Sequence, residues 1–243
     1  QSLFAQTAQK SEPEGERDVF LPSLQVFAWR RGGLYVAAKG GHNGESHNHN
    51  DVGSLMVYVD GHPLLVDAGN MVYTAKTFSD ARYTLWNCRS MYHNVPLIGG
   101  FEQCAGAEYA ARNFRALPDG ASLDMAGAYP AEAGVLSAIR GAWVTTDGVQ
   151  IADEITLQAP EAVTFTMLAR EKPEIRPDGI EFAHARMEIR PMLAAAVEEI
   201  PDTDARMAKN WHGSLWRIAL TAEAGRHHRL TIKISKNNFA NQE

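Results

Sequence analysis

Hydrophobic and polar residues alternate over short stretches of this chain, which is the pattern of half-buried β-strands. The stretches 25–29 and 34–38 flank the glycine-containing segment 30–33, and this arrangement predicts a hairpin. The stretches 54–60 and 64–67, separated by a Gly-His-Pro segment, predict a second one. Each hairpin supplies two antiparallel strands to the predicted fold.

A third hairpin is predicted further along, where Asp147-Gly148 joins 143–146 to 149–151, because Asp-Gly suits a tight primed turn. Helical periodicity is weak throughout, and the only ambiguous stretch, 194–199, is also compatible with a strand. Other strand-like segments are 163–168, 215–221 and 230–234. About a dozen short strands with turn residues between them predict an all-β fold, a multi-stranded antiparallel β-sandwich, rather than βαβ units.

The chain is predicted to contain one large domain. Residues 1–20 are polar and mixed in charge, which is typical of a linker or of the remnant of an interdomain segment. The β-rich pattern occupies 21–243 and shows no internal repeat. A start at Gln1, without a basic and apolar leader, indicates a mature or truncated piece of a longer protein.

Composition narrows the class of protein. Of 243 residues, 45% are hydrophobic and 21% charged, which supports a packed core and argues against disorder. No apolar run approaches the roughly 20 residues of a membrane-spanning helix. The net charge of −6 argues against a nucleic-acid coat protein, although it allows a local basic pocket. Cys88 and Cys104 provide neither a disulfide framework nor a cysteine zinc motif, and buried thiols are favoured over a bridge.

One short segment, 40–51, concentrates polar chemistry by placing three histidines and two acids just before the strand predicted at 54–60. Its His47 and His49 are two residues apart, so extended backbone would direct both imidazoles to one face. Such a pair is a common first half of a metal site, because neutral imidazole suits Zn²⁺. The alternative is a polar loop with solvated histidines.

Two later residues add candidate metal ligands. Asp67 ends an apolar run, where a carboxylate is costly unless it is paired or bound to a cation. His93 precedes the apolar stretch 95–98. By itself Asp67 would be an ordinary turn cap. Together with the histidine pair, these two residues favour a metal site.

Three blocks of sequence, in order, resemble the heparinase II/III family of polysaccharide lyases, in the C-terminal β-sandwich domain of that family. The similarity is strongest over 40–103, and 216–220 fits the last strands of the family's domain. The blocks are SHNHND at 46–51, GHPLLVDAG at 61–69 and RSMYHNV at 89–95.

The resemblance implies roles for individual residues. His49, Asp67 and His93 occupy the positions of the family's ligands to one Zn²⁺, which is expected to be mainly structural. His47 takes the place of a catalytic histidine that faces the substrate cleft. By analogy with other zinc sites, Asn94 or Asp51 is expected to orient a ligand imidazole.

The predicted second hairpin makes it difficult for these ligands to share one metal. If Gly61-His62 forms the turn, Asp67 lies opposite Met56, and His49 lies seven residues further along, about 23 Å at strand rise. A shared metal therefore requires the segment 49–54 to fold back, and Gly53 is the expected place for the bend.

The segment 82–89 carries positive and aromatic side chains that are expected to line the cleft. Arg89 and Tyr83 are the candidate catalytic residues, Tyr83 because the family uses a tyrosine from this side. Arg82 and Trp86 are the candidate substrate-binding residues. Arginine can pair bidentately with the carboxylate of a sugar acid, and an indole can stack on a sugar ring.

Other polar residues are predicted to have ordinary structural roles. The arginines before His93 have an alternative as solvated side chains paired with Asp80 or Glu102. The pair His227-His228 is predicted to be a surface strand end. His184 has no acidic or histidine partner at ligand spacing in the sequence.

The implied reaction is β-elimination in a uronate-containing polysaccharide. An enzyme must neutralise the carboxylate, remove the C5 proton and protonate the leaving C4 oxygen, and histidine suits such transfers near neutral pH. The family's complete enzymes carry an N-terminal helical toroid that this chain lacks, so we expect little activity from the isolated chain. The expected partners are an acidic polysaccharide, that helical domain and a second copy in a homodimer. The expected location is periplasmic or secreted.

Two rival interpretations stay open at this point. A cupin-like metalloenzyme also combines a His-x-His pair with a later histidine, but it expects a glutamate soon after the pair, and 50–54 contains none. The other rival is a non-catalytic carbohydrate-binding β-sandwich whose metal is purely structural.

Overall fold

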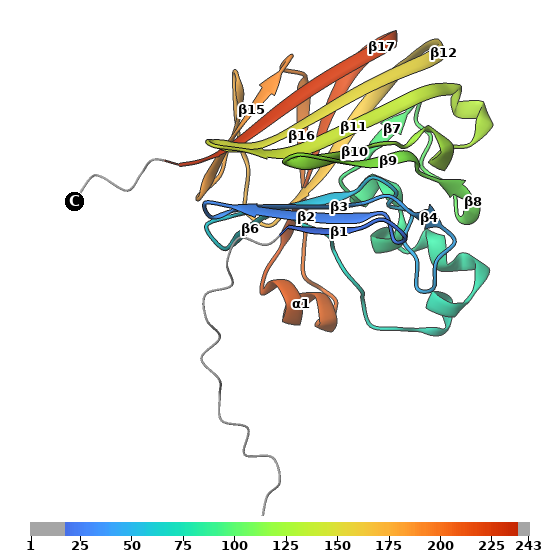
Figure 1. Cartoon of the computed structure of the whole chain (residues 1–243). Coiled ribbons are helices and arrows are strands. Elements are labelled where there is room, and N and C mark those ends of the chain that lie inside the picture. The colour runs from blue at the N-terminus through green and yellow to red at the C-terminus, as the bar shows by residue number, and fades with distance from the viewer. Residues whose placement is uncertain (1–17, 238–243) are drawn as a thin grey trace, which may run out of the picture.

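The computed structural model describes residues 18–237, which form two layers of antiparallel strands (Figure 1). The layer that lies lower in Figure 1, which we call the front layer, contains, in spatial order, β1 (Val19–Leu21), β2 (Val26–Arg31), β3 (Leu34–Lys39), β5 (Leu55–Val59) and β6 (His62–Leu65). The back layer contains β9 (Arg112–Leu117), β10 (Gly120–Asp124), β11 (Val135–Thr145), β12 (Gly148–Ala169), β17 (Leu215–Lys236), β15 (Ala185–Arg190), β14 (Gly179–Glu181) and β13 (Glu174–Arg176). The predicted all-β antiparallel sandwich is confirmed.

Two long strands, β12 and β17, organise the back layer, and each has 22 residues. They pair with each other along most of their length, with irregular register between Thr156 and Val163. The three strand-like segments predicted at 163–168, 215–221 and 230–234 therefore belong to only two strands. Beyond the irregularity, β12 also pairs with β7 (Pro96–Ile98), and β17 pairs with β16 (Ala194–Ile200), so the ambiguous stretch is a strand.

The first hairpin turns at Gly32-Gly33, within the predicted segment 30–33, whose two arginines belong to β2, and the other two turns are each shifted by one residue. In the second hairpin Val59 pairs with His62, so Asp60-Gly61 forms the turn rather than Gly61-His62. Asp60 and Gly61 have φ of +50° and +82°, as a primed turn requires. In the third hairpin Thr145 pairs with Gly148, and the predicted turn residue Gly148 begins β12 instead.

One α-helix, α1 (Ala205–Trp211), was not predicted from the sequence. The side chain of Asp204 caps it by accepting from the backbone N–H groups of Arg206 and Met207. Met207 is buried in a small hydrophobic cluster with Val66 and Leu168, apart from the main core. No helix among the described residues is long and apolar enough to cross a membrane.

The chain between β6 and β7 is built from short 3₁₀ turns rather than strands. These turns carry several of the candidate site residues. The turns themselves were not predicted from the sequence. These turns are Ala75–Phe78, Asp80–Thr84, Trp86–Cys88 and Ser90–Tyr92. The other short elements described are β4 (His42–Asn43), β8 (Gly106–Ala110) and the 3₁₀ turns Ala126–Ala128 and Ala131–Ala133.

The main core lies between the two layers and contains alternate residues of the strands on both sides. Phe27 and Val36 of the front layer and Ile155 of the back layer are completely buried within it. Both cysteines are free, Cys88 buried and Cys104 half-buried. At the N-terminal end, β1 already begins at Val19, within the stretch expected to be linker, and residues 1–17 of that stretch lie outside the described part.

Candidate metal site

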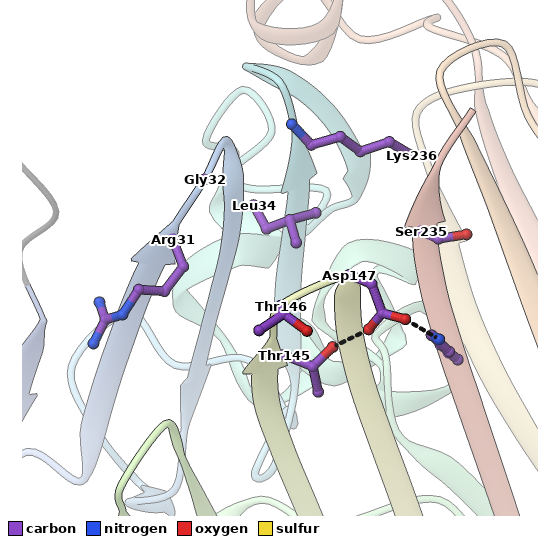
Figure 2. A pocket seen from close by; sticks show the side chains of 9 residues that line it. Arg31, Gly32, Leu34, Thr145, Thr146, Asp147, Ser235 and Lys236 are labelled. Carbon is purple, nitrogen blue, oxygen red and sulfur yellow. Dashed lines mark hydrogen bonds and ion pairs between the residues drawn. The ribbon is translucent and has the colours of Figure 1, made fainter. Parts of the chain in front are cut away.

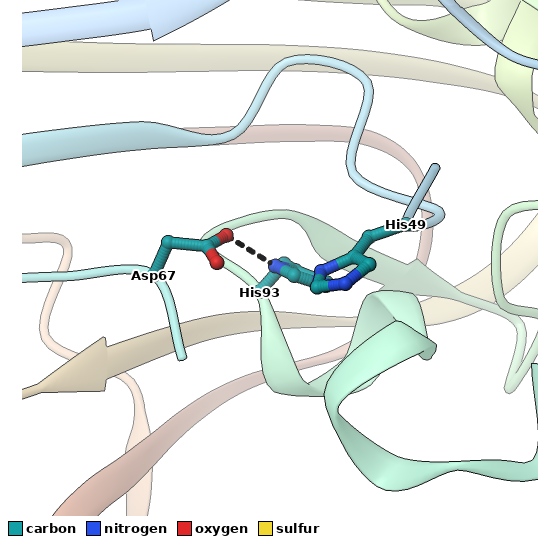
Figure 3. Close-up of side chains that lie close together, drawn as sticks. All are labelled: His49, Asp67 and His93. Atoms are coloured by element: carbon teal, nitrogen blue, oxygen red, sulfur yellow. Dashed lines mark hydrogen bonds and ion pairs between the residues drawn. The ribbon is translucent and has the colours of Figure 1, made fainter. Parts of the chain in front are cut away.

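Three residues from distant parts of the sequence meet near the end of the front layer (Figure 3). His49 lies in the loop before β5, Asp67 follows β6, and His93 follows the 3₁₀ turn Ser90–Tyr92. Each offers one ligand atom, and these atoms all lie within 4.8 Å of one another. The fold therefore brings together the residues that the sequence suggested as ligands, and this group could hold a metal ion.

A tight turn allows His49 to approach the other two residues. The backbone N–H of Ser54 donates to the carbonyl of Asp51 at 2.9 Å, which closes the turn. Gly53 has φ of +85° there, and a Cβ at this position would lie 2.2 Å from the sulfur of Met125. The expected bend at Gly53 is confirmed, and only glycine fits it without strain.

His93 is fully buried, and its two ring nitrogens have different partners. Nε2 donates to the carbonyl of Asn87 at 3.0 Å, because a carbonyl oxygen can only accept. Nδ1 consequently faces the Asp67 carboxylate, 2.8 Å from Oδ2. A backbone carbonyl thus selects the ring nitrogen that can bind metal. Asn94 or Asp51 was expected to orient a ligand imidazole, and for His93 the group that does so is the Asn87 carbonyl instead.

The side chain of Asn94 instead forms hydrogen bonds to three segments beneath the site, which are β5, the chain directly after β6, and β12. Its amide donates to the carbonyls of Leu55 at 2.6 Å and Val66 at 2.9 Å, and its oxygen accepts from the backbone N–H of Leu168 at 2.7 Å. Asn94 is 2% exposed, and the polar atoms of its side chain are satisfied. It positions His93 through the backbone rather than by touching the ring.

Burial and mutual attraction together set the charges of the three residues. Burial raises the pKa of Asp67, but His93, His49 and the backbone N–H of Gly69 outweigh it and hold the pKa well below its usual range. Burial also opposes a charge on His93, yet the Asp67 carboxylate raises the pKa of that ring. The pKa of His49 is lowered, mainly by burial. Neutral His49 and ionised Asp67 are the forms that bind a divalent cation.

The donor set fits a metal, and polar atoms without partners lie close by in the sequence. Two imidazoles and one carboxylate suit Zn²⁺, usually at about 2.0–2.2 Å from the ion. The side-chain amide of Asn48 and the side-chain oxygen of Asn50, on either side of His49, are buried without a hydrogen-bond partner among the described residues. Such groups are usually satisfied by water, an ion or a ligand.

His47 does not continue an extended strand, so the expectation of two imidazoles on one face through β geometry was wrong. Its φ of +59° turns the backbone. The exposed ring stacks on Tyr73, with centroids 6.0 Å apart and planes inclined by 8°. A shared pocket nevertheless joins the two histidines. Its lining residues are His47, His49, Asn70, Met71, Val72, Tyr73, Thr77, Arg82, Leu85, Asn87 and Cys88.

Sequence reasoning missed the aromatic wall beside His47. Tyr73 is 41% exposed, packs edge-on against the ring of Phe78 at 5.5 Å, and has the guanidinium of Arg206 5.5 Å from its centroid. Arg206 belongs to α1, which is far away in the sequence. No local pattern connects these residues, and the unpredicted helix concealed the contact.

Arg82 and Trp86 both lie near the site, in different surroundings. Arg82 lines the pocket, and its guanidinium donates to the carbonyls of Asn48 at 2.9 Å and Thr77 at 3.0 Å. It therefore holds the loop between His47 and His49 in place. Trp86 packs edge-on against Tyr92 at 5.3 Å and borders the cluster around Met207, so part of its ring serves packing.

Arg89 and Tyr83, the other two candidates of this segment, do not line the pocket formed by the described residues. Arg89 forms an ion pair with Glu102, whose second oxygen accepts from the backbone N–H of Met91 at 3.2 Å. This pairing is the alternative that the sequence offered for Arg89. Tyr83 is half-buried in the 3₁₀ turn Asp80–Thr84.

Two histidines outside the site have surroundings that the sequence did not predict. His228 is only 7% exposed within β17, where Nε2 donates to the carbonyl of Glu161 at 2.9 Å, so it is not a surface residue. His184 does have partners in space. Its Nδ1 lies 2.6 Å from a Glu171 oxygen, and its ring stacks on His62 with centroids 3.6 Å apart.

A separate cavity lies beside Leu34, at the opposite end of β3 from the metal site (Figure 2). Asp147 accepts there from Thr145 at 2.9 Å and from Lys233 at 2.6 Å, and Lys236 is ion-paired with Asp60. Since these charges neutralise one another, we assign no chemistry to this cavity.

Solved structures share the fold. A heparinase III structure superposes with a TM-score of 0.68 at 12% identity, over 92% of this chain and 36% of that one. The heparan sulfate lyase HepC mutant from Pedobacter heparinus gives 0.66 at 12% identity, over 92% and 37%. A further heparinase III gives 0.64 at 14% identity, over 88% and 35%. This chain thus spans little more than a third of each. At these identities the likeness concerns the fold alone.

Comparison with curated protein sequences gives no match. The family model described as heparinase II/III-like, C-terminal, matches residues 13–238, which is nearly the whole chain. The chain therefore belongs to the heparinase II/III-like C-terminal domain family.

Proposed function

We propose that this chain is the zinc-binding β-sandwich domain of a polysaccharide lyase that cleaves uronate-containing chains by β-elimination. The observation that carries the proposal is the convergence of His49, Asp67 and His93 beside the exposed ring of His47. Family membership supports the lyase class, and the pocket that joins both histidines supports a link between the metal and the reaction.

Zn²⁺ would be held by His49, Asp67 and His93. Its role there would be structural, because it would link the three chain segments that carry these ligands. His47 is two residues from His49 on the same short loop, so fixing His49 also limits the movement of His47. Arg82 restrains the loop from the other side by binding the Asn48 carbonyl. The protein thus holds an imidazole at the mouth of a pocket while leaving it open to a ligand.

The proposed catalytic work of His47 is proton transfer or neutralisation of the uronate carboxylate. β-Elimination requires both, because the C5 proton is weakly acidic while the adjacent carboxylate is charged. Tyr73 stacks on His47, and the guanidinium of Arg206 lies over the Tyr73 ring, so the two residues add an aromatic ring and a positive charge near His47 that suit an acidic sugar. They join Arg82, Trp86, Tyr83 and Arg89 as candidates for substrate contact or catalysis.

We further propose that a helical domain of the same polypeptide completes the active site and that the complete protein acts in the periplasm or outside the cell. This chain covers only 36% and 37% of the first similar structures, which leaves room for such a domain. The pocket beside His47 is lined by two short segments, 47–49 and 70–88, and we propose that a partner surface is needed to enclose a polysaccharide there. The isolated chain should accordingly bind zinc but show little cleavage.

The test uses the complete protein with alginate, heparan sulfate and hyaluronan as probes, and it measures unsaturated uronate by ultraviolet absorbance and bound zinc by elemental analysis. His47→Gln should lower turnover about 10²–10⁴-fold while zinc stays bound, as for the loss of a general acid or base. His49→Gln should lose both zinc and activity. The exposed His227→Gln is the matched control and should change neither.

Three outcomes would contradict parts of the proposal. Full turnover by His47→Gln would show that His47 takes no part in the reaction. Elemental analysis that finds no zinc in the wild-type protein would refute the proposed metal site. Binding of the polysaccharides without any unsaturated product would favour a non-catalytic carbohydrate-binding domain. Arg89→Ala and Tyr83→Phe, measured in the same assay, decide whether those residues act in catalysis.

A further inference from the structure

The outward side of the front layer is largely apolar, although this side of a sandwich normally faces water. Its charged residues are Arg30, whose guanidinium lies over the ring of Tyr35, and Lys39, which is paired with Asp51. Alternation along the strands directs Phe27, Val36 and Val57 into the core, with no exposure. Their neighbours, which point the other way, are also largely apolar. We call them the outer apolar face, made up of Val26, Ala28, Tyr35, Met56, Tyr58 and Pro63, all half-buried.

The back layer provides an internal comparison, because its outward side is polar. Glu154 and Thr156 of β12 and Arg229 and Lys233 of β17 occupy the outward positions there. Their alternate neighbours, such as Ile155, are buried in the core. An antiparallel sheet with one wet face shows this clean alternation, whereas apolar residues on both faces indicate a sheet covered on both sides.

The outer apolar face is hollowed and leads to the metal site. Tyr35 and Tyr58 form an edge-to-face pair at 5.6 Å and line a depression together with Met56. Met56 also lines the adjoining depression, which ends at the metal-ligand candidate Asp67 and at Asp51. Asp51 is held there by Lys39, with 2.9 Å between Nζ and Oδ1. Whatever covers this face therefore borders the metal site.

The size of the face suits a domain interface. The five front strands span about 19 Å across their hydrogen bonds and about 17 Å along their length. A partner covering this area would bury about 650 Å² counted on both sides, which is at the low end of the range for contacts between domains of one chain.

We infer that the outer apolar face is the docking surface for another domain of the same polypeptide. The similar structures extend well beyond this domain, which accounts for 36% of the first of them. In β1, Val19 lies opposite Ala28 and Leu21 lies opposite Val26, and each of the two β1 side chains is 42% exposed. They therefore extend the outer apolar face. The chain thus enters the sandwich along the surface that needs a cover.

This inference rests on the domain organisation proposed above, but not on lyase activity or on zinc, so its test uses neither. Hydroxyl-radical footprinting with mass spectrometry measures how fast individual side chains are oxidised, and Met56, Tyr35 and Tyr58 are reactive targets. The experiment compares the complete protein with this 243-residue chain at equal concentration. Phe101, 40% exposed and away from the outer apolar face, is the internal control.

In the complete protein, oxidation of the three targets should fall about threefold or more, as expected when half-exposed side chains become buried between domains. Phe101 should react equally in both samples. Met56→Glu in the complete protein should restore fast oxidation of Tyr35 and Tyr58, and Thr156→Glu, on the polar outward side of the back layer, should not. Circular dichroism in the far ultraviolet and a cooperative thermal transition report that each variant is folded.

Equal oxidation of Met56 in both samples would overturn the inference, as would a gene that encodes no further domain. Protection that appears in the 243-residue chain itself and rises with concentration, together with a doubled mass in light scattering, would also overturn it by identifying a second copy as the cover. Protection without any lyase activity would support the docking surface while refuting the proposed function, so the two failures are distinguishable.

Discussion

Arg140 connects the back layer to two backbone segments that position the candidate metal site, and replacing it with methionine should destabilise the protein strongly. Its guanidinium pairs with Asp153 across β11 and β12, at 2.7 Å from Nε and 2.6 Å from the terminal nitrogen. It also donates to the carbonyls of Gly53 at 2.9 Å and of Asn94. Arg140 and Asp153 are only 5% and 3% exposed.

The magnitude follows from what the substitution leaves behind. Arg140→Met keeps an unbranched apolar stem but removes the guanidinium, so the Asp153 carboxylate stays buried without its counter-charge, and such a change costs about 3–5 kcal/mol of unfolding free energy. Removing both charges in Arg140→Met/Asp153→Leu avoids that penalty. The double variant should thus be more stable than the sum of the single changes predicts, with a coupling of about 2–3 kcal/mol.

The assay is equilibrium urea unfolding of each variant in a double-mutant cycle. The matched control is Arg229→Met, because Arg229 and Glu154 form an ion pair of 3.0 Å between β17 and β12, but with 73% and 59% of their side chains exposed. Loss of that surface pair should change stability by less than about 1 kcal/mol. Zinc affinity of Arg140→Met, measured by chelator competition, should fall about tenfold, because Arg140 holds the backbone at the Gly53 bend and at Asn94, next to the candidate ligand His93.

A cost below about 1 kcal/mol for Arg140→Met would refute this reasoning, since a buried pair cannot be broken so cheaply. Additive behaviour in the cycle would do the same, because it would mean that Arg140 and Asp153 do not depend on each other. Unchanged zinc affinity in a variant with the expected loss of stability would separate the two roles and leave Arg140 a purely structural residue.

Three further changes test the site. Removing the metal with a chelator should lower the unfolding free energy of the wild type by about 2.7 kcal/mol relative to zinc at 100 times its dissociation constant, and Asp67→Asn should abolish this difference in calorimetry. Arg82→Gln, which loses two charge-assisted hydrogen bonds to backbone carbonyls, should cost about 1–3 kcal/mol in urea unfolding and increase hydrogen exchange in the segment 47–49. Asn94→Ala leaves three backbone groups without their partner and should cost about 3 kcal/mol or more, whereas Thr164→Ala, which removes one exposed hydroxyl contact, should cost under about 1 kcal/mol.

The fold class followed from local patterning, because the period of two along a half-buried strand appears directly in the residues. The positions of the turns did not follow so closely. Asp60 adopts positive φ beside Gly61, and this pair decides the register of the second hairpin, whereas the sequence offers Gly61-His62 equally well. A shift of one residue changes which side chains lie opposite each other but leaves both strands in place.

The helix α1 and the 3₁₀ turns escaped prediction for a related reason. α1 has seven residues, about two turns, so its one buried position, Met207, gives no periodic signal. Its stability comes from packing on Val66 and Leu168, which are distant in the sequence. The aromatic wall at Tyr73 depends on Arg206 from this helix, and for that reason it was missed as well.

The metal site shows most clearly where inference from residues ends. His49 and Asp67 were identified by residue type and by resemblance to a family, but their meeting depends on Gly53, whose positive φ reverses the loop. The ring nitrogen of His93 that faces Asp67 is selected by the backbone carbonyl of Asn87, a group that every residue possesses and that no motif records. Residue types therefore nominate the ligands of such a site, whereas buried backbone hydrogen bonds determine whether the ligands can act together.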